Sequence, residues 1–448
     1  MASSSPPPRT VVIAGAGIVG LTTAISLRAL PTPPTVIIHE RRPEEGALSG
    51  PGGIMIQPNG LAALSALADG SGEAVVAALN AVSCPLGRGG FQSATGKDLY
   101  IAEPAGVTLG ERTDDLGVCV ARTALMGVLA EAAKIGQPGG VEVVWESAVT
   151  SYTTTDGAVD KVDVHVKTSG QAATIRGVDV LIGADGLWSG VRSAVDAVTG
   201  RPSTPRHYGG LMWWRGSVSF SAVAARCADI GRLAWGQAWL PRGGSMGYFR
   251  LGGDDMAWYA SAPRPADAPV DGSPLAELLA EFGPTRGTTP PVYAAIVDAV
   301  AAAGSDTINR APVYSRGVPV AAAGVGPVWG TGPVTLVGDA AHAIFPSMGQ
   351  GACVGMEDAA ELAAALAAAW RDGQPGGVPA ALRAYEAARA PRVTRVGVES
   401  ARVYDLSALT GGVSIWLRDT VYSVLPQWIV DRQFSWLYDY KPTPVLVA

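Results

Sequence analysis

The chain has 448 residues, among them 33 lysines or arginines and 39 aspartates or glutamates, so its formal net charge is −6. Because nucleic acids and anionic membranes require a basic face on their partner, neither is an expected partner of this chain. Hydrophobic residues make up 48% and charged residues only 16% of the sequence, which excludes a disordered or fibrous protein.

The first predicted unit is a strand, a glycine-rich turn, a helix and a second strand. The strands are Thr10–Ala14 and Thr35–His39, and the turn holds Gly15, Gly17 and Gly20 in the pattern G-x-G-x-x-G. This order is the fingerprint of a dinucleotide-binding βαβ unit. The glycines should permit a tight turn, backbone approach to a pyrophosphate and close helix–strand packing, which leaves helix N–H groups aimed at the phosphates. A glycine turn without a ligand is the alternative interpretation.

An acidic residue follows the second strand, twenty residues after the last glycine of the turn. Glu40 at this position would accept hydrogen bonds from ribose hydroxyls and disfavour a 2′-phosphate. The unit should therefore bind FAD or NAD and not NADP. Arg41, beside it, is a further candidate contact to the nucleotide.

The middle of the chain predicts two different sheets. Over 141–174, short β-rich runs broken by turns indicate an antiparallel meander, and 178–182 is a buried strand that ends in Gly183-Ala184-Asp185-Gly186. Over 202–333, the aromatic residues lie in short strands, which indicates a separate sheet. The pattern of buried strand and helix then returns, so the nucleotide-binding domain is predicted to be discontinuous.

The most informative segment is a buried strand that stops at Asp339, and a loop that leads into a long helix over 352–370. A carboxylate at a strand end can hydrogen-bond ribose or ribitol hydroxyls. Gly349 and Gly351 permit close backbone approach, so amides at the helix N-terminus could face an anionic reduced isoalloxazine. The alternative interpretation is an ordinary strand-to-helix loop.

Taken in order, these motifs resemble those of the single-component (group A) FAD-dependent aromatic hydroxylases, with the para-hydroxybenzoate hydroxylase fold and the style of the salicylate- and urate-hydroxylase branches. The matching motifs are the glycine turn with Glu40, the DG motif around Asp185, and the GD motif of Gly338-Asp339 with its following loop. The resemblance implies an α/β fold: a discontinuous Rossmann-like FAD-binding domain of glutathione-reductase type, an inserted β-sheet substrate domain and a helical C-terminal tail.

By this resemblance, residues 10–80, 112–200 and 331–400 form the FAD-binding domain, 81–111 and 201–330 the substrate domain, and 401–448 the tail. Arg122 and Asp339 should contact FAD, and Asp185 should serve both FAD and nicotinamide binding. The full set of predicted cofactor-binding residues is Gly15, Gly17, Gly20, Glu40, Arg41, Arg122, Asp185, Gly186, Asp339, Pro346, Gly349, Gln350, Gly351 and Ala352. No second strand-flanked G-x-G-x-x-G occurs, which agrees with transient docking of NAD(P)H.

The chemistry that the resemblance implies is hydride transfer from NAD(P)H to FAD, reaction with O2 to a flavin hydroperoxide, and hydroxylation of a small aromatic or phenolic substrate. A cation beside a phenol oxygen would favour the phenolate, and we expect Arg215 to supply it. An arginine stacked on Trp213 or Trp214 is the alternative. Tyr248 and His207 are further catalytic candidates, against core and surface roles respectively. For His342, a hydrogen bond that stabilises the loop is expected rather than catalysis.

Other functions stay open at this point. The same fold could epoxidise an alkene or an indole double bond, bind flavin without turnover, or serve as an NAD-dependent dehydrogenase. The four cysteines form no C-x-x-C pair and predict neither a disulfide framework nor a zinc site, so no metal is expected. With no secretory signal in the first nine residues and no apolar run long enough for a membrane span, we expect a soluble, cytoplasmic monomer or homodimer.

Overall fold

The computed structural model describes residues 9–102, 117–155, 158–202, 204–265, 267–268, 272–283, 289–304, 308–316, 329–373 and 376–445. Parts of the predicted domain segments 81–111, 112–200, 201–330, 331–400 and 401–448 lie outside these ranges, as does the chain before Arg9.

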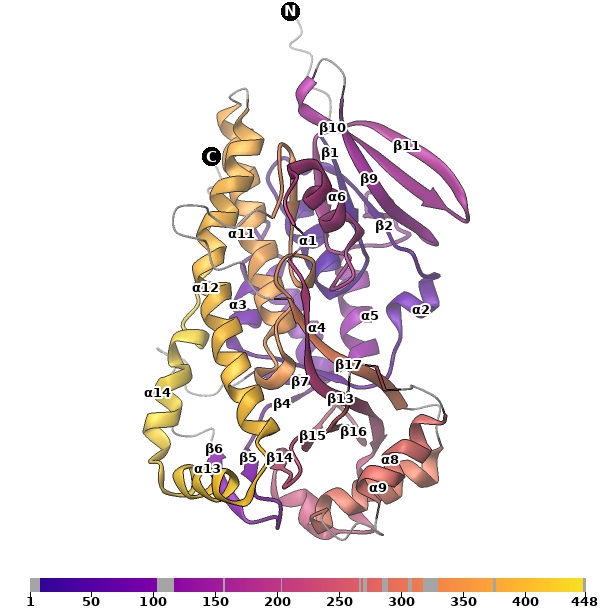
Figure 1. The fold of residues 1–448 in the computed structure, drawn as a ribbon. Helices are drawn as coiled ribbons and strands as arrows, with labels where there is room; N and C mark the ends of the chain where they lie inside the picture. Colours follow the sequence, from indigo (N-terminus) through magenta and orange to yellow (C-terminus); the bar gives the residue numbers. More distant parts are fainter. Residues whose placement is uncertain are drawn as a thin grey trace, which may run out of the picture.

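A five-stranded parallel sheet forms the core of the upper half of the molecule (Figure 1). In spatial order its strands are β18 (Val334–Leu336), β12 (Val180–Gly183), β1 (Thr10–Ala14), β2 (Thr35–His39) and β8 (Glu142–Val144). Parallel strands covered on both faces are apolar along their whole length, as Val11, Val12 and Ile13 are here, all fully buried. The predicted first strands are confirmed.

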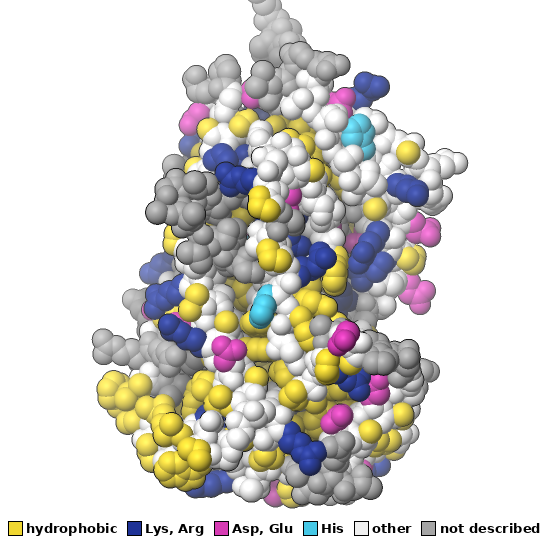
Figure 2. Space-filling model, in the orientation of Figure 1, with side chains coloured by type: hydrophobic (Ala, Val, Ile, Leu, Met, Phe, Trp, Pro, Cys, Tyr) yellow, Lys and Arg dark blue, Asp and Glu magenta, His cyan; other side chains and the backbone are white. Residues whose placement is uncertain are grey.

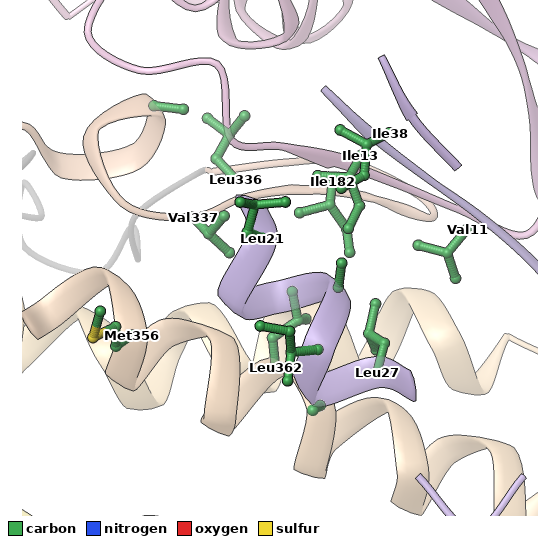
Figure 3. Close-up of a cluster of buried hydrophobic side chains, with 14 of the residues drawn as sticks. Val11, Ile13, Leu21, Leu27, Ile38, Ile182, Leu336, Val337, Met356 and Leu362 are labelled. Atoms are coloured by element: carbon green, nitrogen blue, oxygen red, sulfur yellow. The ribbon is translucent and has the colours of Figure 1, made fainter. Parts of the chain in front are cut away.

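Two long elements pack on this sheet. Helix α1 (Ile18–Arg28) lies between the sheet and α11 (Gly351–Asp372), and Figure 3 shows Leu21 and Leu27 of α1 between strand residues such as Ile182 and the α11 residue Leu362. This packing carries the end of the glycine turn and the start of α11 to the same region, although they are more than 300 residues apart in the sequence.

Both three-stranded sheets that the structure describes are antiparallel. The meander is confirmed as β9 (Ser147–Thr155), β10 (Ala158–Thr168) and β11 (Gln171–Val178), whereas β8 joins the parallel sheet instead. A further sheet joins β3 (Gly53–Ile56), β7 (Val118–Ala121) and β4 (Ser83–Pro85).

A seven-stranded sheet forms the lower half (Figure 1). In spatial order its strands are β17 (Ile308–Arg316), β13 (Arg206–Ser219), β16 (Asp255–Pro263), β15 (Ser245–Arg250), β14 (Trp235–Trp239), β5 (Gly89–Gln92) and β6 (Asp98–Ala102). Helices α8 (Pro274–Phe282) and α9 (Pro291–Ala303) share a buried cluster with one face of this sheet. Successive side chains of a strand point to opposite faces of a sheet. The strand residues that alternate with those of this cluster therefore point to the other face, which borders the cavity described below.

Helix α12 (Gly377–Ala408) runs beside α11 and continues into the lower half (Figure 1). The predicted domain boundary between residues 400 and 401 therefore falls inside a continuous helix. Helices α13 (Gly412–Val424) and α14 (Gln427–Tyr438) follow. Apolar side chains, with Val413 and Trp416 among the most exposed, gather over α13 and α14 in Figure 2.

The remaining helices are α2 (Glu44–Leu48), α3 (Pro58–Ser65), α4 (Gly72–Ala81), α5 (Arg122–Ala132), α6 (Gly190–Thr199), α7 (Phe220–Ala224) and α10 (Asp339–His342), with 3₁₀ turns at Ala228–Arg232 and Pro346–Met348. Among the helices that the structure describes, none has both the length and the hydropathy to span a bilayer. In the same residues, no group of three or more His, Cys, Asp or Glu side chains is arranged to hold a metal ion.

Candidate active site

A cavity of about 690 Å³ separates the parallel sheet from the seven-stranded sheet. Gly17 and Asp339 line it on the parallel-sheet side, Trp213 and Tyr259 on the opposite side, and Tyr422 of α13 borders it as well. The cavity therefore joins the expected nucleotide cleft to the face of the aromatic-rich sheet.

The glycines of the turn have separate roles. Gly15 has φ +100°, and a Cβ there would lie 2.6 Å from the carbonyl oxygen of Ala184. A Cβ on Gly20 would lie 2.0 Å from the carbonyl oxygen of Gly15, so both positions exclude a side chain for packing reasons. Gly17 lines the cavity, and a Cβ there would meet no described atom within 4 Å. Gly17 is thus the residue at which a ligand can approach the backbone.

Glu40 is buried and holds the turn in place. Its Oε2 accepts a hydrogen bond from the Ala16 amide at 2.9 Å, and its Oε1 accepts from the backbone and side chain of Arg42. Burial alone would raise the pKa of Glu40, but these hydrogen bonds hold it below its usual range. Three of roughly four acceptor positions on the carboxylate are used, which leaves one for a ribose hydroxyl. Arg41 is exposed and is not among the residues that line the cavity.

The DG motif carries a buried carboxylate with spare acceptor capacity. Oδ2 of Asp185 accepts hydrogen bonds from the amides of Gly190 and Val191, while Oδ1 is buried without a partner among the described residues. Burial raises the pKa of Asp185. The neighbouring Gly186 lines the cavity. Asp185 itself is not among the residues that line the cavity, so its contact with a ligand stays a prediction.

The GD motif places a second carboxylate deep in the cavity. Asp339 follows Gly338, whose φ of +56° makes the sharp turn at the end of β18. Burial among the surrounding protein atoms raises the pKa of Asp339. The Asp339 side chain is nevertheless accessible, because it faces the cavity. It lies beside the first turn of α11, where a Cβ on Gly351 would be 4.0 Å from Oδ1 of Asp339.

The N-terminus of α11 is open toward the cavity. Gly349, Gly351, Ala352 and Pro346 all line it, and the N-cap residue Gln350 makes no side-chain cap. The amides of the first turn are therefore available to an electron-rich group of a ligand. The Gln350 side chain itself is buried behind the loop, where it donates to Gln57 and accepts from Asn59.

A buried network of charges supports this loop from behind. Asp358 accepts hydrogen bonds from the Gly338 amide and from Arg389, and its Oδ2 is hydrogen-bonded to Nε2 of His342. His342 thus makes the loop-stabilising contact that its position predicts. The adjacent Glu357 pairs with Arg389 and Arg392.

Arg122 and Arg192 connect distant segments. Arg122 lines the cavity and donates to the carbonyl oxygen of Ser49 at 2.6 Å, and burial lowers its pKa. Arg192 is buried, with its pKa lowered to about 10 by burial, and donates to the carbonyls of Ala340 and Ala341. Arg192 therefore joins the DG and GD motifs.

The three predicted catalytic residues occupy different environments. Arg215 faces the cavity from β13, and its Nε donates to Asn309 at 3.3 Å; burial lowers the pKa of its guanidinium. Tyr248 borders the cavity, but its ring packs under the sheet, 5.9 Å from that of Tyr293 in α9. His207 is exposed near the start of β13 and does not line the cavity.

The predicted alternative for Arg215 was stacking on a neighbouring tryptophan. Trp214 points to the helix-covered face of the sheet, where its ring lies edge-on to Phe282. Trp213 instead stacks on Tyr259, with ring centroids 5.0 Å apart. The guanidinium of Arg215 is accordingly directed to the cavity rather than into an aromatic stack.

Comparison with known proteins shows what this chain is similar to. A family model described as an FAD binding domain matches residues 294–400, which include the GD motif. The chloroplastic zeaxanthin epoxidase of Spinacia oleracea is 31% identical over 400 residues, which cover 86% of this chain and 52% of that protein. The aurachin C monooxygenase/isomerase of Stigmatella aurantiaca is 28% identical over 427 residues, or 95% of this chain and 96% of that protein.

Solved structures share the fold along nearly the whole chain. Klebsiella pneumoniae HpxO complexed with FAD and uric acid has a TM-score of 0.74 at 24% identity, with 96% of each chain covered. A salicylate hydroxylase substrate complex has a TM-score of 0.70 at 19% identity, with 97% of this chain and 96% of that chain covered. The chain is therefore similar, in sequence and in fold, to FAD-dependent monooxygenases. The chain spans about half the length of the first curated relatives that it matches.

The residues around this cavity fit FAD. The open backbone at Gly17, the accessible carboxylate of Asp339 and the uncapped N-terminus of α11 all border one continuous cavity. They would suit, respectively, the pyrophosphate, the hydroxyl groups and the electron-rich end of the flavin. The predicted α/β fold class is confirmed by the shared fold, and FAD as cofactor by the match to an FAD binding domain.

The sequence reasoning did not identify the charge network, and on the sheet side of the cavity it identified Arg215 and Tyr248 but not Gln237. Glu357 and Asp358 were a usable signal, because two adjacent acids in an alanine-rich helix require buried partners. No comparable signal marked Gln237, which lines the cavity and accepts a hydrogen bond from Tyr259.

Proposed function

We propose that this protein is an FAD-dependent monooxygenase that uses NAD(P)H and O2 to hydroxylate a small aromatic or phenolic compound. The observation that carries the proposal is the single cavity that runs from the FAD-binding motifs to an aromatic-lined sheet with Arg215 in its wall. Bound FAD, once reduced by NAD(P)H, would activate O2 and supply one oxygen atom to the substrate. The rest of the chemistry falls to the protein's own residues.

On the cofactor side, the protein binds and orients. Gly17 and the N-terminus of α1 would hold the pyrophosphate, and Asp185 and Asp339 would accept from hydroxyl groups. The amides at the start of α11, from Gly351 onward, would stabilise negative charge on the reduced ring system. Apolar walls exclude water from the reacting centre.

On the substrate side, Arg215 would hold the substrate oxygen. A guanidinium beside a phenol lowers the pKa of the phenol and so raises the electron density of the ring. The surrounding protein lowers the pKa of Arg215 below its usual range although the side chain is accessible from the cavity, and an arginine remains cationic in proteins. The orientation of Arg215 toward the cavity supports this role. The catalytic roles of Tyr248 and His207 stay proposals, with Tyr248 at the border of the cavity and His207 outside its lining.

Epoxidation of an alkene is the second candidate function. Relatives named zeaxanthin epoxidase reach 31% identity over most of this chain, and the cavity wall is rich in aromatic residues. An olefin would need no cationic anchor, so its turnover should not depend on Arg215.

The decisive experiment is aerobic turnover of the purified flavoprotein with a panel of phenols and a panel of olefins. NADH and NADPH would be compared as reductants, and the oxygenated product identified by mass. In this assay Arg215→Ala should raise KM for a phenol about 10- to 100-fold, as expected for loss of a hydrogen bond to a charged group, and leave flavin content unchanged. Arg215→Lys should restore part of the affinity, because it keeps the charge but not the planar fork.

Two results would contradict the hydroxylase proposal. One is a protein that retains no flavin absorbance after purification. The other is substrate-stimulated NAD(P)H oxidation by olefins alone, with epoxide products and no response to Arg215→Ala, which would favour the second candidate.

A further inference from the structure

One row of cross-strand neighbours crosses the cavity face of the seven-stranded sheet. Residues directly opposite each other on adjacent strands project to the same face of a sheet. The observed register gives the order Arg215, Tyr259, Gly247, Gln237, Phe91 and Tyr100, from β13 to β6. Every member of this row except Gly247 lines the cavity.

The glycine in the row makes room for a tyrosine ring. A Cβ on Gly247 would lie 2.2 Å from Cζ and 2.3 Å from the hydroxyl oxygen of Tyr259. The ring of Tyr259 therefore lies across the backbone of Gly247 toward the next strand, where its hydroxyl donates to Oε1 of Gln237 at 2.8 Å. Trp213 stacks on this ring with an interplanar angle of 6° and holds it flat against the sheet.

This hydrogen bond decides which atoms of Gln237 remain available. Burial raises the pKa of Tyr259, so the hydroxyl keeps its proton, and in the structure it donates to Oε1 of Gln237. One acceptor position of the Gln237 amide oxygen is then used, and its Nε2 has no hydrogen-bond partner among the described residues. A side-chain amide in this state presents two N–H donors and no charge.

We propose that Gln237, oriented by Tyr259, donates a hydrogen bond to an uncharged oxygen on a planar, fused-ring aromatic substrate. This inference rests on the proposed function and adds to it a second anchor. Arg215 and Gln237 are three strand spacings apart in the row, or roughly 14 Å between their backbones at about 4.8 Å per strand. A single small phenol cannot bridge the distance between these two residues. A fused-ring compound with a carbonyl or hydroxyl oxygen at one end can contact the cavity face of the sheet between them.

Binding of two matched probes to the purified flavoprotein tests the inference. The probes are 4-quinolone, which carries a neutral carbonyl oxygen on a fused ring, and quinoline, which lacks that oxygen. Binding would be measured by titration calorimetry without NAD(P)H, so that no turnover is required. We expect Gln237→Leu to weaken 4-quinolone about 3- to 10-fold, the usual range for one neutral hydrogen bond, and to leave quinoline unchanged.

Tyr259→Phe tests the orienting role separately. It keeps the ring and removes the hydroxyl, so it should reduce the preference for 4-quinolone over quinoline without loss of quinoline binding. Gly247→Ala should have a similar effect by displacing the ring of Tyr259. The control is Gln137→Leu, the same chemical change at an exposed glutamine outside the cavity lining, which should change neither affinity. Gln237→Met replaces Gln237→Leu if the latter does not fold.

The inference is overturned if Gln237→Leu weakens both probes equally, if it changes neither, or if the unmodified protein binds 4-quinolone no better than quinoline. Its failure is distinct from failure of the proposed function. The latter is judged by flavin content and phenol-stimulated NAD(P)H oxidation, neither of which depends on selectivity between the two probes.

Discussion

The two walls of the cavity are built on different principles. The cofactor wall is made of backbone turns, strand ends and a helix N-terminus, with Gly17 and Asp339 as its exposed points. The substrate wall is made of side chains such as Trp213, Tyr259 and Gln237 from several strands of one sheet. The cofactor wall thus offers mainly backbone groups to FAD, whereas the shape and polarity of the substrate wall depend on individual side chains.

The support behind the two walls differs as well. Behind the cofactor wall lies the buried network of Asp358, His342 and Arg389. Behind the substrate wall lies the apolar cluster shared with α8 and α9. Changes behind the first wall should therefore act on folding and flavin binding together, and changes on the second mainly on ligand choice.

The largest expected effect is that of Asp358→Ala. The change leaves Arg389, His342 and the Gly338 amide without their buried partner, at a cost of about 3–5 kcal/mol in the free energy of unfolding. Urea unfolding followed by fluorescence would measure it. If the free energy of unfolding falls by less than the contribution of an exposed ion pair, the network does not support the cofactor wall.

The same carboxylate predicts a dependence on pH. Burial alone would raise the pKa of Asp358, but the charges of His342 and Arg389 and two hydrogen bonds hold it below the usual value. Its stabilising contribution should thus be complete above about pH 4, the ordinary range for an aspartate, and decline as the pH falls below it. Urea midpoints across this range would show the decline, and Asp358→Asn should make it shallower.

Two glycines in one turn provide an internal comparison. Gly20→Ala forces a Cβ to within 2.0 Å of a backbone oxygen and should destabilise the fold by about 1–3 kcal/mol. Gly17→Ala should cost the unliganded protein at most about 0.5 kcal/mol and yet reduce FAD affinity, because its Cβ projects into the cavity. Melting temperature and flavin content distinguish the two. The control is Gly127→Ala, in the exposed part of α5, which should add about 0.5–1 kcal/mol of stability.

The smallest expected effect lies on the substrate wall. A Cβ on Gly89 would lie 2.2 Å from the indole nitrogen of Trp235, whose ring can move, so Gly89→Ala should cost at most about 1 kcal/mol. Tryptophan emission should change while flavin content stays constant. Loss of flavin in this variant would remove the distinction between the two walls.

The sequence by itself determined the cofactor wall, because its chemistry depends on neighbours in the chain. A strand, three glycines at fixed spacing and Glu40 describe one local unit, and the DG and GD motifs are equally short. Even so, the buried position of Gln350 and the exposed position of Arg41 depend on packing that the motifs do not encode.

Only the tertiary structure decided the substrate wall. Gln237 and Tyr259 are 22 residues apart and meet because β15 lies between their strands and carries a glycine at the shared register position. The same register separates Arg215, which faces the cavity, from Tyr248, whose ring lies on the opposite face. Alternation tells which residues share a face within a strand, but strand order and register depend on long-range pairing, which no local pattern specifies.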